Sequence, residues 1–309
     1  MEIIRSFTPS PSVTDASVAI GNFDGVHLGH RVVLDLAKAH GRPWGALTFE
    51  PHPREFFAPG APPFRLMNAE ARHHRFDTLG ADVLYELPFD SALASLTAAE
   101  FVRSVLVDGL ALKHVVVGAD FCFGKGRQGT VRDLQRLGAE HGLDVTTAEL
   151  REIDGMDGPV SSTRIREALA QGRPRDAASM LGHWHRIEGE VLHGDKRGRG
   201  LGFPTANMSI DGLHPPRFGV YAVIADVLTG PHRGRHLGVA SVGVRPMFGA
   251  NAANLETHIF DFQGDLYGEH LSIALVEYLR PEQKFDSLDA LSAQMRYDSR
   301  QAREILSKI

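Results

Sequence analysis

The sequence has a single cysteine, Cys122, and no long hydrophobic run. One cysteine excludes an internal disulfide and a structural zinc site built on cysteines, and it suits a reducing compartment. No stretch approaches the roughly 18 consecutive apolar residues of a membrane-spanning helix, and the first residues do not have the pattern of a signal peptide. We therefore expect a cytoplasmic protein with no membrane partner.

An excess of positive charge is also missing. Lysine and arginine number 33 against 38 aspartate and glutamate residues, which gives a net charge of −5. Because binding to a nucleic-acid backbone usually needs a strongly basic surface, we expect no nucleic-acid partner. The content of 43% hydrophobic and 23% charged residues is typical of a globular protein. The 309 residues suffice for about two domains.

Residues 1–180 alternate strand-like apolar runs with amphipathic helical runs, a pattern typical of parallel βαβ units. The expected strands are 17–23, 44–50, 81–87, 114–121 and 143–150. The expected helices are 27–40, 68–80, 97–110, 130–142 and 161–172. We predict an α/β, Rossmann-like doubly wound domain, in which ligands bind outside the carboxyl ends of the strands.

Residues 181–309 have a different pattern, with short strand-like pieces separated by turn residues. The expected strands are 186–194, 219–228, 236–243, 255–262 and 271–280. We predict a small antiparallel β-barrel, because closure removes exposed edge strands. Helical spacing returns at 287–309. Its expected buried positions are Leu288, Leu291, Met295 and Ile305. We place the domain boundary within 172–186.

The segment GNFDGVHLGH, residues 21–30, lies where a strand should end and a helix should begin. His27 and His30 would share one face of the first helical turn. Free N–H groups and the positive end of the helix dipole attract phosphate there, and both imidazoles could donate to phosphate oxygens. A zinc site would need a third ligand, which is not visible nearby. Two exposed histidines at a helix start are the plainer alternative.

The segment VSSTRIR, residues 160–166, predicts a second anion site, because hydroxyls and free N–H groups at a helix start precede Arg166. The alternative is a capped helix with a surface arginine. The segment GKGRQG, residues 124–129, fits the GxGxxG pattern, but a dinucleotide fingerprint should open the first βα unit. We interpret it as a phosphate-contacting loop and expect no NAD-dependent oxidoreductase.

The segment GDKRGRGLGFPTAN, residues 194–207, interleaves glycines with cations. Backbone N–H groups and positive charges could therefore approach a polyphosphate together. The candidate polyphosphate- and metal-binding residues of this segment are Gly194, Lys196, Gly198, Gly202, Pro204, Thr205 and Asn207; the family resemblance given below implies that they bind ATP. The hydroxyl of Thr205 and the amide oxygen of Asn207 are hard ligands that suit Mg²⁺.

These motifs together resemble the bacterial family of bifunctional riboflavin kinases and FAD synthetases, over about residues 16–300. The first half is similar to HxGH nucleotidyltransferases through GNFDGVHLGH, TFEPHPREFF, VVVGADFCFGKGRQG and VSSTRIR, in that order. The second half is similar to riboflavin kinases through PTAN, RFGVYAV, LETHIFDF, DLYG and LRPEQKFDSLDAL.

For the first half, the resemblance implies that ATP adenylylates FMN to FAD and that pyrophosphate is released. His27, His30 and Arg166 would act on the reacting phosphates. The implied ATP-binding residues are Gly21, Phe23, Asp24, His27, His30, Asp120, Ser162, Thr163 and Arg166. Phe57 and Phe123 would lie near the flavin ring.

For the second half, the resemblance implies phosphorylation of riboflavin to FMN with Mg-ATP. Thr205 and Asn207 would hold the magnesium ion, and Glu256 would take the proton from the alcohol that attacks the γ-phosphate. Departures from the family pattern are Cys122, Ser241 and Met247, where arginine, asparagine and threonine are usual. Their effect on the nucleotide and flavin contacts stays open.

Two other functions stay open. The nucleotidyltransferase domain could act on another phosphorylated acceptor, such as a pantetheine phosphate or nicotinate mononucleotide, although the appended barrel argues against this. An RNA-binding protein related to the tRNA synthetases, which also use HxGH, is disfavoured by the negative charge and the lack of a KMSKS-like loop. We expect riboflavin, FMN and ATP as small-molecule partners, and the sequence does not determine the oligomeric state.

Overall fold

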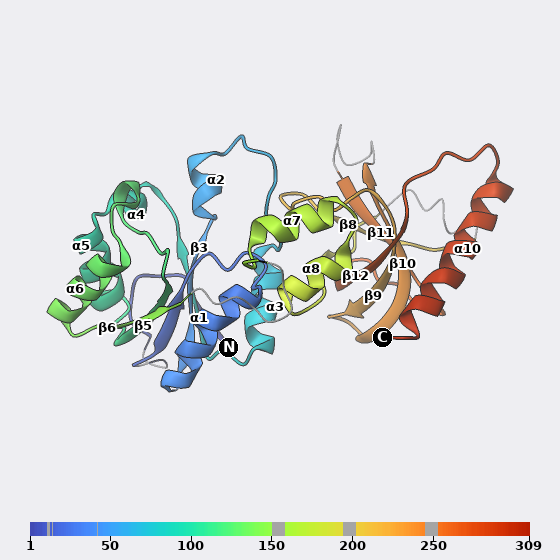
Figure 1. Cartoon of the computed structure of the whole chain (residues 1–309). Coiled ribbons are helices and arrows are strands. Elements are labelled where there is room, and N and C mark those ends of the chain that lie inside the picture. Colours follow the sequence, from blue (N-terminus) through green and yellow to red (C-terminus); the bar gives the residue numbers. More distant parts are fainter. Residues whose placement is uncertain (11–12, 14, 42, 150–157, 194–201, 245–252) are drawn as a thin grey trace. The chain divides into compact units, whose positions relative to one another are not determined.

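A computed structural model describes residues 1–10, 13, 15–41, 43–149, 158–193, 202–244 and 253–309. The chain divides into two compact units (Figure 1). The first unit comprises Met1–Ala61 and Arg72–Val160, and the second comprises Pro62–Ala71 and Ser161–Ile309. Among the described residues, no helix combines the length and the apolar character needed to cross a membrane.

The first unit is built on a six-stranded sheet whose strand pairs are all parallel. Its strands are β1 (Glu2–Ile4), β2 (Ser17–Ile20), β3 (Trp44–Glu50), β4 (Val83–Pro88), β5 (His114–Gly118) and β6 (Asp144–Ala148). The spatial order is β1-β4-β3-β2-β5-β6. The chain runs outward from β2 to β4 and then returns to β5 on the other side, so the order reverses between β2 and β5. A doubly wound sheet binds ligands at such a reversal, which confirms the predicted fold class.

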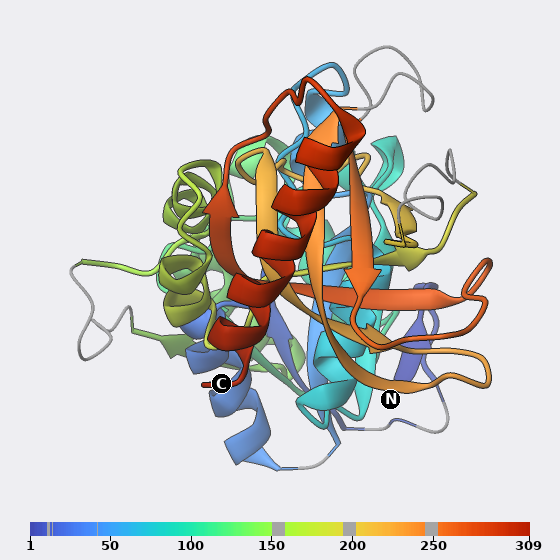
Figure 2. The same ribbon diagram turned by 90° about the vertical axis from the view of Figure 1, so that its right-hand side faces the viewer.

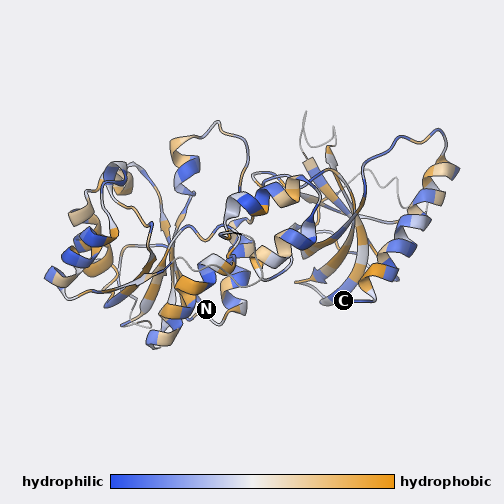
Figure 3. Cartoon of the chain, in the orientation of Figure 1, coloured by the Kyte–Doolittle hydropathy of each residue, from blue (hydrophilic) through white to orange (hydrophobic). Residues whose placement is uncertain are grey.

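Helices accompany this sheet, whose strands are mostly apolar, as Figure 3 shows, and mostly buried. They are α1 (Leu28–His40), α2 (Pro53–Phe57), α3 (Ala69–Thr78), α4 (Ser91–Ser95), α5 (Ala98–Glu100), η1 (Phe101–Val107), η2 (Lys125–Arg127) and α6 (Val131–His141). Val18 and Ile20 of β2 share a core with residues of η1 and α6. Helix α1 lies along β2, β3 and β5, with Leu34 and Ala37 buried.

The second unit contains a six-stranded antiparallel sheet with spatial order β7-β12-β9-β10-β11-β8. Its strands are β7 (Arg186–Glu190), β8 (Ala206–Ser209), β9 (Gly219–Val227), β10 (Gly234–Val244), β11 (Ala253–Ile259) and β12 (His270–Arg280). An isolated bridge between Leu192 and Asn207 brings the two edges together. The sheet is therefore a nearly closed barrel, as predicted.

The described helices that accompany the barrel are α7 (Ser162–Ala170), α8 (Pro174–Leu181) and α10 (Leu288–Leu306). Figure 2 shows α10 lying along the outside of the barrel strands, and it contacts β9, β10 and β12. The C-terminal helix was predicted, but Leu288 is 67% exposed and the expectation that it is buried was wrong. The residues that α10 buries fully are Asp298, Ala302 and Leu306, whereas Leu291, Met295 and Ile305, which were expected to be buried, are half-buried.

The segment Pro62–Ala71 belongs to the second unit although the chain on both sides of it belongs to the first. The amide nitrogen of Asn68 donates to the carbonyl oxygen of Glu188 at 2.9 Å, and Glu70 forms an ion pair with His270 at 2.6 Å. The periodicity of the sequence could not reveal that this segment packs with the second unit, because periodicity reports a local pattern and not the partner that a segment packs against.

Candidate active sites

The loop between β2 and α1 carries the HxGH motif, at the strand end and helix start that the sequence indicated. The strand ends at Ile20, and three of the next six residues have positive φ: Phe23 at 49°, Gly25 at 89° and Val26 at 43°. His27 then caps α1 in an extended conformation. This tight turn places both histidines at the carboxyl end of β2, beside the reversal of strand order.

The two imidazoles are stacked on each other. Their ring centroids lie 3.6 Å apart with an interplanar angle of 12°. The backbone N–H of His30 donates to Nδ1 of His27 at 3.2 Å. Since a backbone N–H can only donate, Nδ1 of His27 is the acceptor, and the neutral ring therefore carries its proton on Nε2.

Burial governs the charge of His30. Its Nδ1 atom is buried and has no hydrogen-bond partner among the described residues. Burial first, and the neighbouring His27 second, hold the pKa of His30 well below its usual 6.5. His30 is therefore neutral at pH 7, and an arriving anion would favour its protonated, donating form.

Two aspartates stand near the reversal point. Asp24 lies in the HxGH loop and is buried, with 6% of its surface exposed. Asp120 is exposed in the turn that follows β5, and β5 pairs directly with β2. The carboxyl ends of β2 and β5 therefore supply six of the nine residues that the resemblance assigns to ATP: Gly21, Phe23, Asp24, His27, His30 and Asp120.

The two phenylalanines expected near the flavin lie in different surroundings. Phe57 ends α2 and is 68% exposed. The centroid of its ring lies 5.1 Å from that of Phe56 and 5.8 Å from that of Phe89. Phe123 is 6% exposed and packs against Phe101 and Phe121 within the core. Phe57 thus offers an open aromatic face, whereas Phe123 is a core residue in this structure.

Helix α7 carries Ser162, Thr163 and Arg166 and belongs to the second compact unit. Ser161 caps the helix, since its hydroxyl accepts from the N–H of Arg164 at 3.3 Å. The Nε of Arg166 donates to the carbonyl oxygen of Phe64, and its guanidinium group lies 5.4 Å from the Phe64 ring centroid. The predicted helix is confirmed, with its arginine oriented by a residue of the Pro62–Ala71 segment.

In the barrel, three polar side chains form a row across neighbouring strands. Glu256 of β11 pairs with Asn207 of β8 on one side and with Ser241 of β10 on the other. Directly paired residues project from the same face of a sheet. Asn254, two residues before Glu256, donates to the Glu256 carboxylate at 3.5 Å. The predicted base and a predicted magnesium ligand are therefore neighbours.

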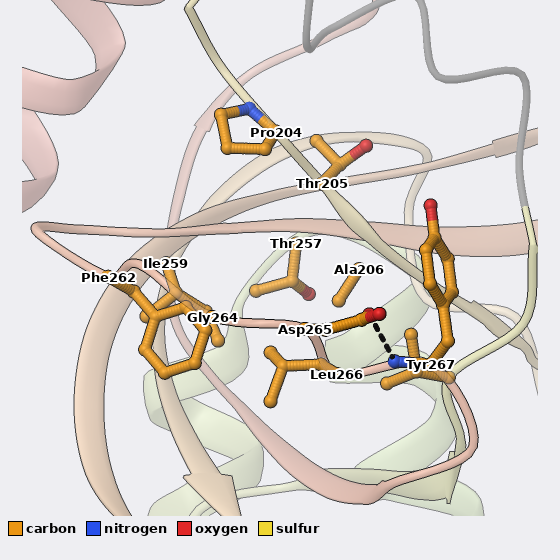
Figure 4. Close-up of a pocket in the computed structure, with 11 residues that line it drawn as sticks. Pro204, Thr205, Ala206, Thr257, Ile259, Phe262, Gly264, Asp265, Leu266 and Tyr267 are labelled. Atoms are coloured by element: carbon orange, nitrogen blue, oxygen red, sulfur yellow. Dashed lines mark hydrogen bonds between the residues drawn. The ribbon is translucent and has the colours of Figure 1, made fainter. Parts of the chain in front are cut away.

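A pocket adjoins the PTAN segment. It encloses about 480 Å³, counting its open mouth. Figure 4 shows the residues that line it, which are Val191 and the ten that are labelled: Pro204, Thr205, Ala206, Thr257, Ile259, Phe262, Gly264, Asp265, Leu266 and Tyr267. Asp265 accepts from the N–H of Tyr267 at 3.1 Å, which shapes the turn at one wall. An apolar wall with a few polar groups suits a heterocyclic base.

The magnesium ligands proposed from the sequence fit the donor chemistry of this place. Asn207 uses its amide nitrogen to bond the Thr205 carbonyl at 3.4 Å, so its amide oxygen is the atom that could bind a metal. Together with the Thr205 hydroxyl it gives oxygen ligands of the kind that magnesium prefers. No group of three or more histidine, cysteine, aspartate or glutamate residues in the described part of the chain has a metal-binding arrangement.

Part of the predicted kinase loop lies outside the described residues, namely Gly194, Lys196 and Gly198, as does Met247. Gly202 is described, with a left-handed φ of 80°. The sequence did not single out the pocket walls formed by Thr257, Phe262 and Asp265. For Thr257 the signal was the alternation in LETHIFDF, which places Thr257 and Ile259 on one face of the strand and Glu256 on the other.

The comparisons with known proteins agree with this geometry. Residues 10–164 match the family model of FAD synthetase, and residues 181–306 match that of riboflavin kinase. The bifunctional riboflavin kinase/FMN adenylyltransferase of Escherichia coli is 41% identical, and the match covers 93% of this chain and 91% of that protein. The protein of the same description from Pseudomonas fluorescens is also 41% identical, with 99% and 98% covered.

A solved structure also spans both units. It is described as a macrolide-efflux protein from Streptococcus pneumoniae, with a TM-score of 0.82, 32% identity and coverage of 97% of this chain and 98% of that one. Two family models in series, together with relatives that match over nearly their whole length, leave little of the chain unassigned. The chain belongs to the family of bifunctional riboflavin kinases/FMN adenylyltransferases.

Proposed function

We propose that the protein phosphorylates riboflavin to FMN in its barrel and adenylylates FMN to FAD at the HxGH loop. The observation that carries the proposal is the stacked imidazole pair, which sits on the first turn of α1 at the carboxyl end of β2. Membership of the family supports both activities, and it disfavours another phosphorylated acceptor or an RNA-binding role. As functional domains we assign residues 1–180 to adenylylation and 181–309 to phosphorylation.

Adenylylation joins a phosphate oxygen of FMN to the α-phosphorus of ATP and breaks the bond to the β-phosphate, which leaves as pyrophosphate. The N–H groups at the start of α1 and the Nε2–H of His27 would donate to the α-phosphate oxygens, where negative charge grows. His30 would share this role once the bound phosphates favour its protonation. Ser162, Thr163 and Arg166 would bind the remaining phosphates, and Phe57 would face the flavin ring.

Phosphorylation transfers the γ-phosphoryl group of ATP to the primary alcohol of riboflavin. The Glu256 carboxylate would take the proton of that alcohol as its oxygen attacks. The pocket beside Pro204 and Thr205 would hold the base of ATP. Thr205 and Asn207 would hold Mg²⁺, which would neutralise charge on the phosphates when bound.

The cell compartment is also a proposal. Cys122 is a free, half-buried thiol. A chain with one free cysteine and no disulfide suits the reducing cytoplasm.

The direct test incubates the pure protein with riboflavin and Mg-ATP and separates the flavins by chromatography. FMN should form first and FAD should follow, with one ADP and one pyrophosphate released for each FAD. Omission of Mg²⁺, with a chelator present, should stop both steps. A mixture that still holds only riboflavin would refute the proposed function.

A further inference from the structure

The turn that presents the two histidines has a backbone that needs support. Phe23 has a φ of 49° and Val26 a φ of 43°. A residue with a side chain pays about 1–2 kcal/mol for the left-handed conformation and keeps it only where surrounding contacts fix it. Phe23 is 1% exposed, so the contacts of its buried ring are the ones that can stabilise this turn.

The Phe23 ring lies between the histidines and helix α3. Its edge meets the ring of His30 at a centroid distance of 5.3 Å and an angle of 70°. It meets the ring of Phe76 at 5.5 Å and 88°. A Cβ atom on Gly21 would lie 3.2 Å from the Cζ of Phe23, so only glycine there leaves the ring its full room. Edge-to-face pairs of this kind are directional contacts.

Phe76 is fixed by the part of α3 that precedes it. Arg72, one turn earlier, is 2% exposed and donates to the carboxylates of Glu50 at 2.7 Å and Glu86 at 2.6 Å. Burial alone would raise the pKa of Glu86, but hydrogen bonds from His73 and Arg72 outweigh it and lower the pKa to about 2. The charged network ties α3 to the ends of β3 and β4, and Phe76 is 0% exposed beneath Phe23.

We propose that Phe76 is a positioning residue for adenylyl transfer, acting through Phe23 on His30. The rings of Phe76, Phe23, His30 and His27 form one continuous column from the helix to the imidazoles. The inference rests on the proposed role of the histidines in FMN adenylylation. Phe76 does not touch the substrate. It sets where the His30 ring stands, and displacements of about 1 Å near reacting groups cost up to about 100-fold in rate.

The test replaces Phe76 by leucine, and by methionine as a second variant that fills more of the space. Loss of the ring lets Phe23 turn away, so kcat for FMN to FAD should fall by about tenfold or more. Riboflavin phosphorylation by the same chain should not change. Water would also reach the imidazole of His30 and should raise its pKa. This pKa is measured by NMR titration, and the His30→Gln variant identifies the signal of His30.

The matched control is Leu106→Ala, which opens a cavity in the core of the same unit at a residue of 0% exposure. It should lower the melting temperature and leave kcat for adenylylation, measured well below melting, near that of the parent. Parent-like kcat and His30 titration in both Phe76 variants would overturn the inference, as would an equal loss of kcat in Leu106→Ala. If His30→Ala itself retained FAD formation, the proposed function would fail instead.

Discussion

At the scale of single residues, burial sets the charge of several histidines. Burial is the first cause, and the neighbouring His183 and His214 add to it, in lowering the pKa of His185 to about 3. The side chain is 3% exposed. The folded protein therefore keeps His185 neutral at pH values where the unfolded chain, with a pKa near 6.5, binds a proton.

This difference predicts a loss of stability in mild acid. Because the unfolded state binds more protons below pH 6.5, the free energy of unfolding of the second unit should fall by about 1.4 kcal/mol for each pH unit below that value. His185→Leu should remove this slope. Trp184 reports on the unit by fluorescence once Trp44→Phe has removed the other tryptophan. Equal slopes in parent and variant, by urea unfolding at pH 6.5 and 5.0, would contradict the explanation.

Residue types and spacing predicted where several candidate residues lie in the fold, because chemistry at a site needs particular residue types at particular positions, and the roles of these residues stay predictions. His27 and His30 lie on a helix start, and Glu256 lies opposite Asn207. Sequence patterns could not reveal Phe76, since a phenylalanine in an amphipathic helix has the same pattern whether it fills space or supports a catalytic loop. That distinction depends on the ring that it meets across the fold.

At the scale of elements, α10 is held to the barrel by two ion pairs of very different burial. Asp298 is 1% exposed, and its carboxylate accepts from Arg280 and Gln294. Asp261 pairs with Arg303, and both side chains are largely exposed. Removal of one partner from a buried pair strands the other charge, whereas an exposed pair exchanges its contact for water.

The two pairs give a matched prediction. Asp298→Ala should lower the free energy of unfolding of the second unit by about 3 kcal/mol, because Arg280 loses the buried carboxylate that accepts its hydrogen bonds. Asp261→Ala, which removes the exposed partner of Arg303 on the same helix, should change the free energy of unfolding little. Urea unfolding followed by Trp184 fluorescence in the Trp44→Phe background measures both. Similar losses in the two variants would show that burial does not decide the strength of this contact.

Most elements followed from hydrophobic periodicity, and the differences have local causes. Strand β3 has the predicted bounds, Trp44–Glu50. The predicted helix over 97–110 is a short α-helix followed by the π-helix η1, Phe101–Val107, and period alone does not separate these types. Strand β1, Glu2–Ile4, was not predicted, because three residues are too few to show alternation.

At the scale of the whole molecule, the compact units do not follow the chain in a simple order. The predicted boundary within 172–186 stays a prediction, and the two matched family models leave residues 165–180 between them. The compact second unit also includes α7, α8 and the segment Pro62–Ala71. The family models divide the chain by sequence similarity, whereas the compact units divide it by the contacts between residues, so the two divisions need not coincide. The assignment of adenylylation to residues 1–180 and of phosphorylation to 181–309 stays a prediction.

The central claim is that two reactions occur at two separate sites, so the most direct measurement compares two single variants on both reactions. Glu256→Gln should abolish riboflavin phosphorylation and leave conversion of added FMN to FAD intact. His30→Ala should do the reverse, and Glu190→Gln, at an exposed glutamate of β7, should affect neither. If Glu256→Gln and His30→Ala each abolished both reactions in a folded protein, the two-site account would be wrong.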